Sequence, residues 1–141
     1  MVQLIVGKKG KGKTKQLLDK VNSAIKETNG NIVYLDKSSK HMYELNNKIR
    51  LIDVSAFPVE NSEQFIGFVS GIISQDHDLE QMYLDSFLKL AVLEDKHEDI
   101  AKTVAELENI SKLFKVDFVL SVSADKEELD PSLYDKIAVS L

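Results

Sequence analysis

The chain has 141 residues, no cysteine and a formal net charge of −5. This length fits one domain, residues 1–141, that buries roughly two-thirds of the surface of its unfolded chain. The lack of cysteine excludes a disulfide scaffold, a thiolate zinc site and a cysteine nucleophile. We expect no signal peptide, because the N-terminal apolar run, residues 2–6, is too short and the lysines follow it instead of preceding it. The longest apolar run, residues 65–73, is about half as long as a membrane span, so we expect a cytoplasmic protein.

Positive charge is concentrated near the start of the chain. Residues 1–20 contain six lysines and one acidic residue, Asp19, whereas the remainder of the chain is strongly acidic. Proteins that bind nucleic acid usually spread positive charge over a whole face. The concentration in one loop therefore favours a small anionic ligand and makes nucleic acid an unlikely main partner.

Apolar runs and helix-period segments alternate along the chain. Short apolar runs predict strands at 2–6, 31–36, 49–54, 79–85 and 116–123, with a last strand within 136–141. Spacings of three and four between apolar residues predict helices at 13–26, 62–75 and 100–114. This alternation predicts an α/β fold with three layers, in which a doubly wound and mainly parallel sheet binds ligands at the carboxyl ends of its strands.

The helix predicted at 62–75 is apolar on nearly all sides, so we expect it to be largely buried. Asn61 and Gln64 resemble a variant capping box at its start. Gly67 and Gly71 form a G-x-x-x-G pattern. We expect these glycines to let the helix approach the sheet closely.

Residues Gly7 to Thr14 match the pattern G-x-x-x-x-G-K-[ST] after a predicted strand and before a predicted helix. The glycines, Gly7, Gly10 and Gly12, allow positive φ and turn successive N–H groups inward to form an anion nest. The helix N-terminus points its dipole at the same place. Lys13 is expected to reach the β- and γ-phosphates, and the Thr14 hydroxyl to ligate Mg²⁺.

We also expect four further lysines in and beside this loop to bind the ligand: Lys8, Lys9, Lys11 and Lys15. The side chains of Lys8, Lys9 and Lys11 either raise the local potential for phosphate or are solvated loop charges. No N-K-x-D guanine signature is present, so ATP is preferred to GTP as the nucleotide.

On this motif the chain resembles the P-loop nucleoside-triphosphatase superfamily. The resemblance implies an acid at a strand end that holds Mg²⁺ through water, and Asp85 in "MYLD" matches it. Asp36 and Asp53 end equally apolar runs and are the alternatives for this Mg²⁺ acid. The superfamily's order of elements favours Asp85, which follows a crossover beyond the second strand and a buried helix.

The resemblance extends to the RecA-like branch, which has an additional strand. It implies a polar γ-phosphate sensor after the next strand, at Ser121 or Ser123. The glutamate that many of these proteins place beside the Mg²⁺ acid is missing, since Ser86 stands there. Asp36 or Glu60 could replace it, so the expected catalytic residues are Lys13 and, as a substitute base, Asp36.

The chain is also similar over nearly its full length to small stand-alone P-loop proteins of Gram-positive anaerobes. The similar segments are "LIVG" with the following "GKT", the central "GFVSGIISQDHDLE", and "YLDSFLK". That family is described generically as ATP-binding. Its resemblance implies ATP as the ligand with Mg²⁺ as the cofactor.

The only arginine of the chain, Arg50, is predicted to be a surface residue where a strand begins. Arginines commonly stabilise phosphoryl-transfer transition states, so their scarcity indicates slow hydrolysis. Tyr34, Tyr43 and Tyr83 are candidates for stacking on a base, and no histidine pair has the spacing of a zinc helix.

We therefore expect a Mg·ATP-binding P-loop protein that is a slow ATPase or a nucleotide-dependent switch. The alternatives are an interaction module that does not hydrolyse nucleotide and a small-molecule kinase. The sequence leaves open whether the protein binds a protein partner or forms a homo-oligomer.

Overall fold

A computed structural model describes residues 1–141. Its six strands are β1 (Val2–Gly7), β2 (Asn31–Asp36), β3 (Arg50–Asp53), β4 (Leu79–Leu84), β5 (Asp117–Ser123) and β6 (Ile137–Ser140). Its four α-helices are α1 (Lys13–Ala24), α2 (Ser62–Ser74), α3 (Phe87–Leu90) and α4 (Ile100–Phe114). The predicted strands and long helices are all present, with boundaries that differ by one or two residues.

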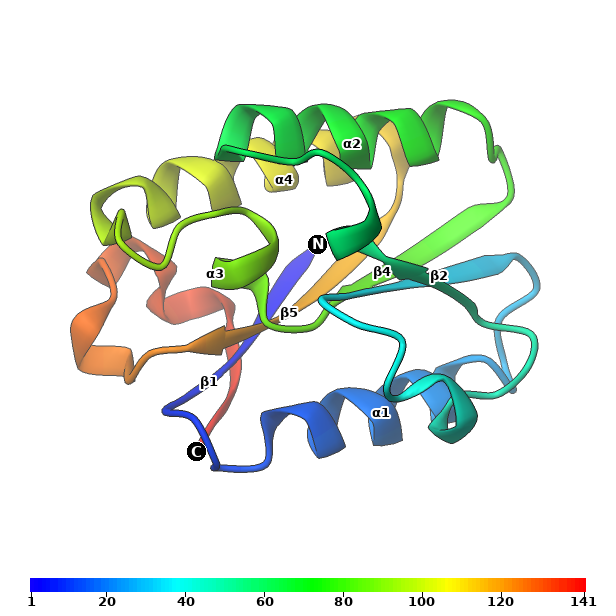
Figure 1. The fold of residues 1–141 in the computed structure, drawn as a ribbon, viewed down its shortest axis with the longest axis horizontal. Helices are drawn as coiled ribbons and strands as arrows, with labels where there is room; N and C mark the ends of the chain where they lie inside the picture. The colour runs from blue at the N-terminus through cyan, green and yellow to red at the C-terminus, as the bar shows by residue number, and fades with distance from the viewer.

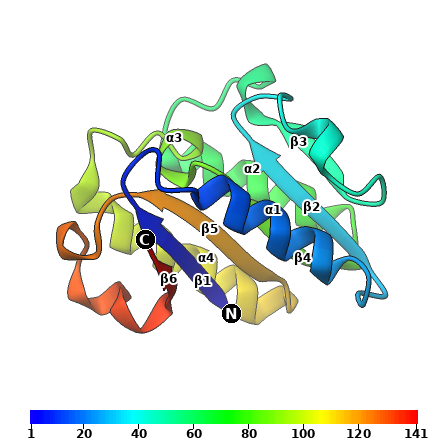
Figure 2. The same ribbon diagram turned by 90° about the horizontal axis from the view of Figure 1, so that it is seen from below.

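The six strands form one sheet in the order β3-β2-β4-β5-β1-β6, and every neighbouring pair is parallel. The predicted α/β class and the parallel sheet are confirmed, and the doubly wound arrangement is consistent with this order. β5 lies between β1 and β4, as the ribbon in Figure 2 shows. β5 therefore separates β1, which the glycine-rich loop follows, from β4, which Asp85 follows.

Helices cover both faces of the sheet (Figure 1). α1 lies alone on one face, where Leu17 and Val21 pack against Ile5, Tyr34 and Tyr83. On the other face α2, α3 and α4 cover a larger core. Because side chains alternate along a strand, Leu4 of β1 belongs to that core while its neighbour Ile5 faces α1.

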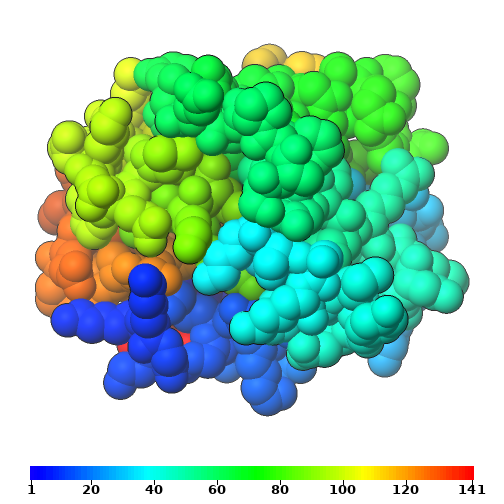
Figure 3. Space-filling model, viewed as in Figure 1, coloured from blue at the N-terminus to red at the C-terminus, as the bar shows by residue number.

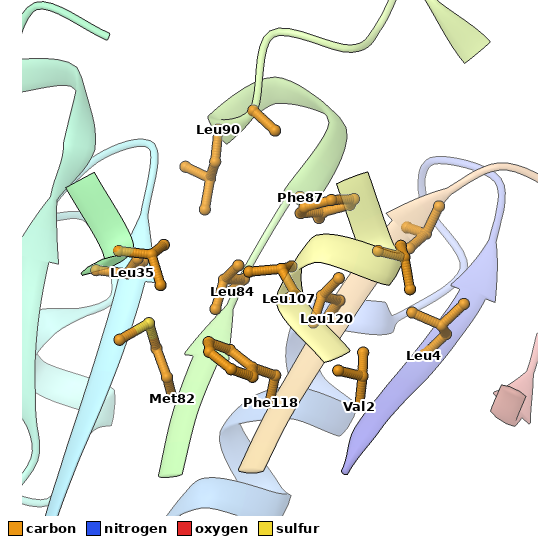
Figure 4. Close-up of a cluster of buried hydrophobic side chains, with 14 of the residues drawn as sticks. Val2, Leu4, Leu35, Met82, Leu84, Phe87, Leu90, Leu107, Phe118 and Leu120 are labelled. Atoms are coloured by element: carbon orange, nitrogen blue, oxygen red, sulfur yellow. The ribbon is translucent and has the colours of Figure 1, made fainter. Parts of the chain in front are cut away.

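The larger core consists of apolar side chains from four central strands and the three helices that cover them. Figure 4 shows Met82 and Leu84 of β4, Phe118 of β5, Phe87 of α3 and Leu107 of α4 among the side chains of this core. All five side chains are buried. These contacts hold the carboxyl ends of β4 and β5 in fixed relative positions, and the site is built on those ends.

The expectation for the glycines of α2 is wrong. A methyl group added at Gly67 or Gly71 would meet nothing within 4 Å, so both glycines face open space rather than the sheet. The helix instead packs through Phe65, Val69 and Ile73, which are buried. The near-uniform apolar composition of α2 hid which side packs, and the glycine side is the exposed one.

The cap of α2 is present in part. The Asn61 side chain accepts a hydrogen bond from the Gln64 N–H at 2.8 Å, as expected. The Gln64 side chain accepts from the Glu60 N–H at 2.7 Å instead of returning to Asn61. No helix of the protein combines the length and the apolar character needed to cross a membrane.

Candidate functional site

The loop after β1 turns sharply at two glycines. Gly10 and Gly12 have φ angles of 82° and 90°, which residues with a Cβ atom rarely adopt. Gly12 occupies the N-cap position of α1, and no side chain caps the helix there. The sequence pattern therefore produces the backbone path expected of an anion nest.

The N–H groups of this loop are left without acceptors. From Lys8 to Lys15 no backbone N–H donates to a backbone or side-chain acceptor within the protein, whereas the Gln16 N–H already bonds to the Gly12 carbonyl. The first turn of α1 also contains no acidic residue. A helix start with free N–H groups and no acidic residue in its own first turn attracts an anion.

Lys13 lies at the centre of this loop and is only 7% exposed. Its Nζ donates to the Lys8 carbonyl oxygen at 2.9 Å, so the ammonium folds back over the nest. Burial lowers the pKa of Lys13, Asp85 opposes that shift, and the charges of Lys37 and Lys9 add to it. An anionic ligand would stabilise the charged form of this lysine.

Asp85 stands at the end of β4 and is 2% exposed. Its Oδ1 accepts hydrogen bonds from the Thr14 hydroxyl at 3.2 Å and from the Ser121 hydroxyl at 2.8 Å. Its Oδ2 accepts from the Tyr34 hydroxyl at 2.9 Å. The carboxylate is thus fixed by α1, β5 and β2 together, next to the phosphate loop.

The residue after this carboxylate is also constrained. Ser86 has a φ of 58°, a left-handed conformation that is uncommon for a non-glycine residue. Its N–H donates to the Ser121 hydroxyl at 2.7 Å. Such local strain is often found beside functional residues.

Asp36 ends β2, on the same face of the sheet as Asp85, and is 1% exposed. Its Oδ1 accepts from the Lys37 N–H at 2.7 Å, and its Oδ2 is buried without a hydrogen-bond partner. Burial raises the pKa of Asp36, and the charge of Asp85 raises it further. Asp36 is therefore near the Asp85 carboxylate but does not line the open cavity.

The other proposed acids lie away from this point. The Asp53 carboxylate accepts hydrogen bonds from the N–H and the hydroxyl of Ser55, so it caps a turn. Glu60 precedes α2 and does not line the cavity. Neither acid is brought to the phosphate loop.

Arg50 is the first residue of β3, so it lies at the edge of the sheet opposite to the phosphate loop. It is exposed and pairs with Asp76 at 3.6 Å. The prediction of a surface arginine at the start of a strand is confirmed. Within one chain this arginine cannot reach a ligand held after β1.

The tyrosines have different environments. Tyr34 and Tyr83 are buried and stack on each other with ring centroids 6.4 Å apart, so neither is available to a base. Tyr43 is 92% exposed and lines a separate cavity beside β3. Only Tyr43 of the three is free to contact a ligand.

One cavity of about 560 Å³ lies over the carboxyl ends of the central strands. Gly10, Gly12, Lys13 and Thr14 line it on one side, and Asp85 lies at the junction with β4. The segments after β2 and β4 close it on the other side. Figure 3 shows these three segments side by side on one face, coloured blue, cyan and yellow-green.

Only some of the predicted loop lysines reach this cavity, whereas both candidate sensor serines do. Lys9 lines it, whereas the ammonium groups of Lys8 and Lys15 pair with Asp125 at 3.5 Å and with Asp19 at 3.1 Å, and Lys11 lies outside. Both serines line the cavity. Ser121 is held by Asp85 and Ser86, while the Ser123 side chain makes no hydrogen bond and is the freer of the two.

The residues around Thr14 suit Mg²⁺ that is held partly by a phosphate ligand. One hydroxyl and one carboxylate oxygen converge at 3.2 Å, and no group of three acidic or histidine side chains could bind a metal alone. Mg²⁺ in phosphate sites commonly keeps one or two protein ligands, several waters and phosphate oxygens. The donor set fits such an ion.

Two features of the site were not predicted: the hydroxyl of Tyr34 as a partner of Asp85, and the basic residues that close the cavity. Lys37, Lys40 and His41 follow β2, and Lys89 and His97 follow β4. These residues could have been expected there, because they lie in the segments that follow two parallel strands, and such segments meet at one edge of the sheet.

A scan against models of known protein families finds no match to this sequence, and a search of curated proteins finds no relative. The geometry of the cavity is therefore the basis for a functional assignment.

Proposed function

We propose that this protein binds Mg·ATP in the cavity after β1 and hydrolyses it slowly, or uses it as a switch. The observation that carries the proposal is the run of free N–H groups from Lys8 to Lys15 around the buried Lys13. Such a run can bind a chain of phosphate oxygens without any change in the backbone.

The position of Asp85 supports Mg²⁺ as the cofactor. Thr14 would ligate the ion, and Asp85 would hold it through water. The ion would neutralise the β- and γ-phosphate oxygens. β5 lies between β1 and β4, which agrees with the additional strand implied by the RecA-like resemblance.

Slow turnover is supported by what surrounds the proposed γ-phosphate position. Ser86 occupies the place of the usual glutamate, and Asp36 is buried, with a raised pKa and no access to the cavity. Arg50 lies at the opposite edge of the sheet. Lys13 and Ser123 would bind phosphate, and neither Asp36 nor Glu60, the two acids named as substitutes for that glutamate, lines the cavity.

Calorimetric titration of the purified protein with Mg·ATP, Mg·GTP and ADP tests binding, and phosphate release then tests hydrolysis. We expect Mg·ATP to bind and to be hydrolysed slowly without any acceptor. Binding without release would favour the non-hydrolysing interaction module, and release only with an added acceptor would favour a small-molecule kinase. Failure of all three nucleotides to bind would contradict the proposal.

A further inference from the structure

The cavity carries more positive charge than the phosphate loop alone supplies. Five lysines line it, Lys9, Lys13, Lys37, Lys40 and Lys89, against the two carboxylates of Asp85 and Glu94. With the histidines neutral this gives +3 in one cavity of a chain whose net charge is −5. The cavity is therefore the point at which an acidic protein gathers positive charge.

Two of these lysines, Lys40 and Lys89, line the cavity from segments other than the loop after β1. We call Lys40, Lys89 and His97 the outer wall; Lys40 follows β2, and the other two follow β4. Neither Lys40 nor Lys89 has a carboxylate within 4.0 Å, whereas Lys8, Lys15 and Lys136 are all paired. The ammonium groups of Lys40 and Lys89 are thus in no ion pair within the protein.

The phosphate chain of a nucleotide does not need the outer wall. The free N–H groups, Lys13 and a Mg²⁺ held by Thr14 and Asp85 would offset much of the charge of a triphosphate, and Lys9 and Lys37, whose charges also act on Lys13, would offset the rest. Lys37 is close enough to Lys13 to lower the pKa of that lysine, so Lys37 belongs with the same ligand. Lys40, Lys89 and His97 are left over.

The lining also restricts what else could occupy this part of the cavity. Leu88 is its only hydrophobic residue, and no aromatic residue other than histidine lines it. A nucleobase or another apolar group would bury little apolar surface here. Lysines, in contrast, are common phosphate ligands.

We infer that the outer wall is a second anion subsite, which binds the phosphate group of a small molecule while the loop after β1 holds the nucleotide. The inference rests on the proposed function for the loop. It concerns the simultaneous binding of two anions, and the second one is either free phosphate or a phosphate monoester.

The test uses protein saturated with Mg²⁺ and a non-hydrolysable ATP analogue, into which inorganic phosphate is titrated by calorimetry at fixed ionic strength. We expect saturable binding of one phosphate to the loaded protein. The double variant Lys40→Gln with Lys89→Gln should weaken that binding by about tenfold or more while the analogue still binds. A second titration with glycerol phosphate shows whether the ester binds more tightly than the free ion.

The control variant combines Lys26→Gln with Lys48→Gln. It makes the same change in net charge with two exposed lysines that lie outside the cavity and in no ion pair. Matching melting temperatures show that both variants fold.

Failure of the ATP analogue to bind the wild-type protein would count against the proposed function and is seen before phosphate is added. The second subsite is overturned separately if phosphate binds only in the absence of the analogue. It is also overturned if phosphate does not bind at all, or if both double variants weaken its binding equally.

Discussion

The hydroxyl of Thr14 lies 3.2 Å from the carboxylate of Asp85, although 71 residues separate them in the chain. The contact joins the first turn of α1 to the end of β4 across the inserted strand β5. It brings together the two side chains that the proposal assigns to Mg²⁺. Tyr34 and Ser121 fix the Asp85 carboxylate from the neighbouring strands, so the pair is already oriented before a ligand binds.

Replacing Asp85 by asparagine should remove the effect of Mg²⁺ on nucleotide binding. In the wild type we expect Mg²⁺ to tighten ATP binding, because the ion bridges the phosphates to Thr14 and Asp85. In Asp85→Asn this tightening should fall by about tenfold or more, since loss of even an outer-shell metal partner has effects of that size. Titration with ATP in Mg²⁺ and in a chelator measures it.

The matched control is Asp53→Asn, because Asp53 ends the edge strand β3 and only caps a turn. It should bind Mg·ATP like the wild type. If Asp36→Asn abolishes the Mg²⁺ effect while Asp85→Asn preserves it, the assignment of the magnesium acid is wrong.

Replacing Asp36 by asparagine should stabilise the protein at neutral pH. Burial and the charge of Asp85 raise the pKa of Asp36 above its usual 3.8, so the folded state binds its proton more tightly than the unfolded state does. Such a group favours folding below the unfolded pKa, and this contribution is lost as the pH rises through the folded pKa. Asparagine keeps the acceptor for the Lys37 N–H without carrying the charge.

Urea unfolding of the wild type and Asp36→Asn at pH 7 and near pH 3.5 checks this effect. The variant should gain stability over the wild type at pH 7, and the gain should shrink at the lower pH. Equal stabilities of the wild type and Asp36→Asn at pH 7 would show that the charge of Asp36 does not destabilise the folded protein.

Replacing Arg50 by alanine should leave nucleotide turnover within about twofold of wild type. Arg50 begins β3 at the edge opposite to the cavity, and the buried Asp76 with which it pairs also accepts hydrogen bonds from Asn31. Steady-state phosphate release measures the turnover. A tenfold fall with an unchanged melting temperature would mean that Arg50 reaches a site on another molecule.

Replacing Gly67 or Gly71 by alanine should stabilise the fold by roughly 0.5–1 kcal/mol each. Both glycines lie in α2 with open space where the methyl group would go. At Gly30, in contrast, a methyl group would collide with the Asp78 carbonyl oxygen, so Gly30→Ala should destabilise the protein. Thermal melts of the three variants compare them, and destabilisation at Gly67 and Gly71 would place a partner against that side of the helix.

Much of the fold could be predicted from the sequence, because each strand is a short apolar run and each long helix has a clear period. The loop at Gly7–Thr14 and the acid at Asp85 could also be located, since both lie directly at strand ends. The exposed side of α2 could not, because isoleucine and phenylalanine occur on several of its sides. The hydrogen bond from Tyr34 to Asp85 depends on β2 and β4 being neighbours, a pairing that no local pattern specifies.

The central claim, that the loop after β1 holds the phosphates of Mg·ATP, is tested most directly by the shift in melting temperature of wild type, Lys13→Ala and Lys11→Ala. A ligand at 100 times its Kd stabilises a protein by about 2.7 kcal/mol, which is readily measured. Mg·ATP should raise the melting temperature of the wild type and of Lys11→Ala, whose side chain lies outside the cavity, and leave Lys13→Ala unchanged. No shift in the wild type, or an equal shift in Lys13→Ala, would contradict the claim.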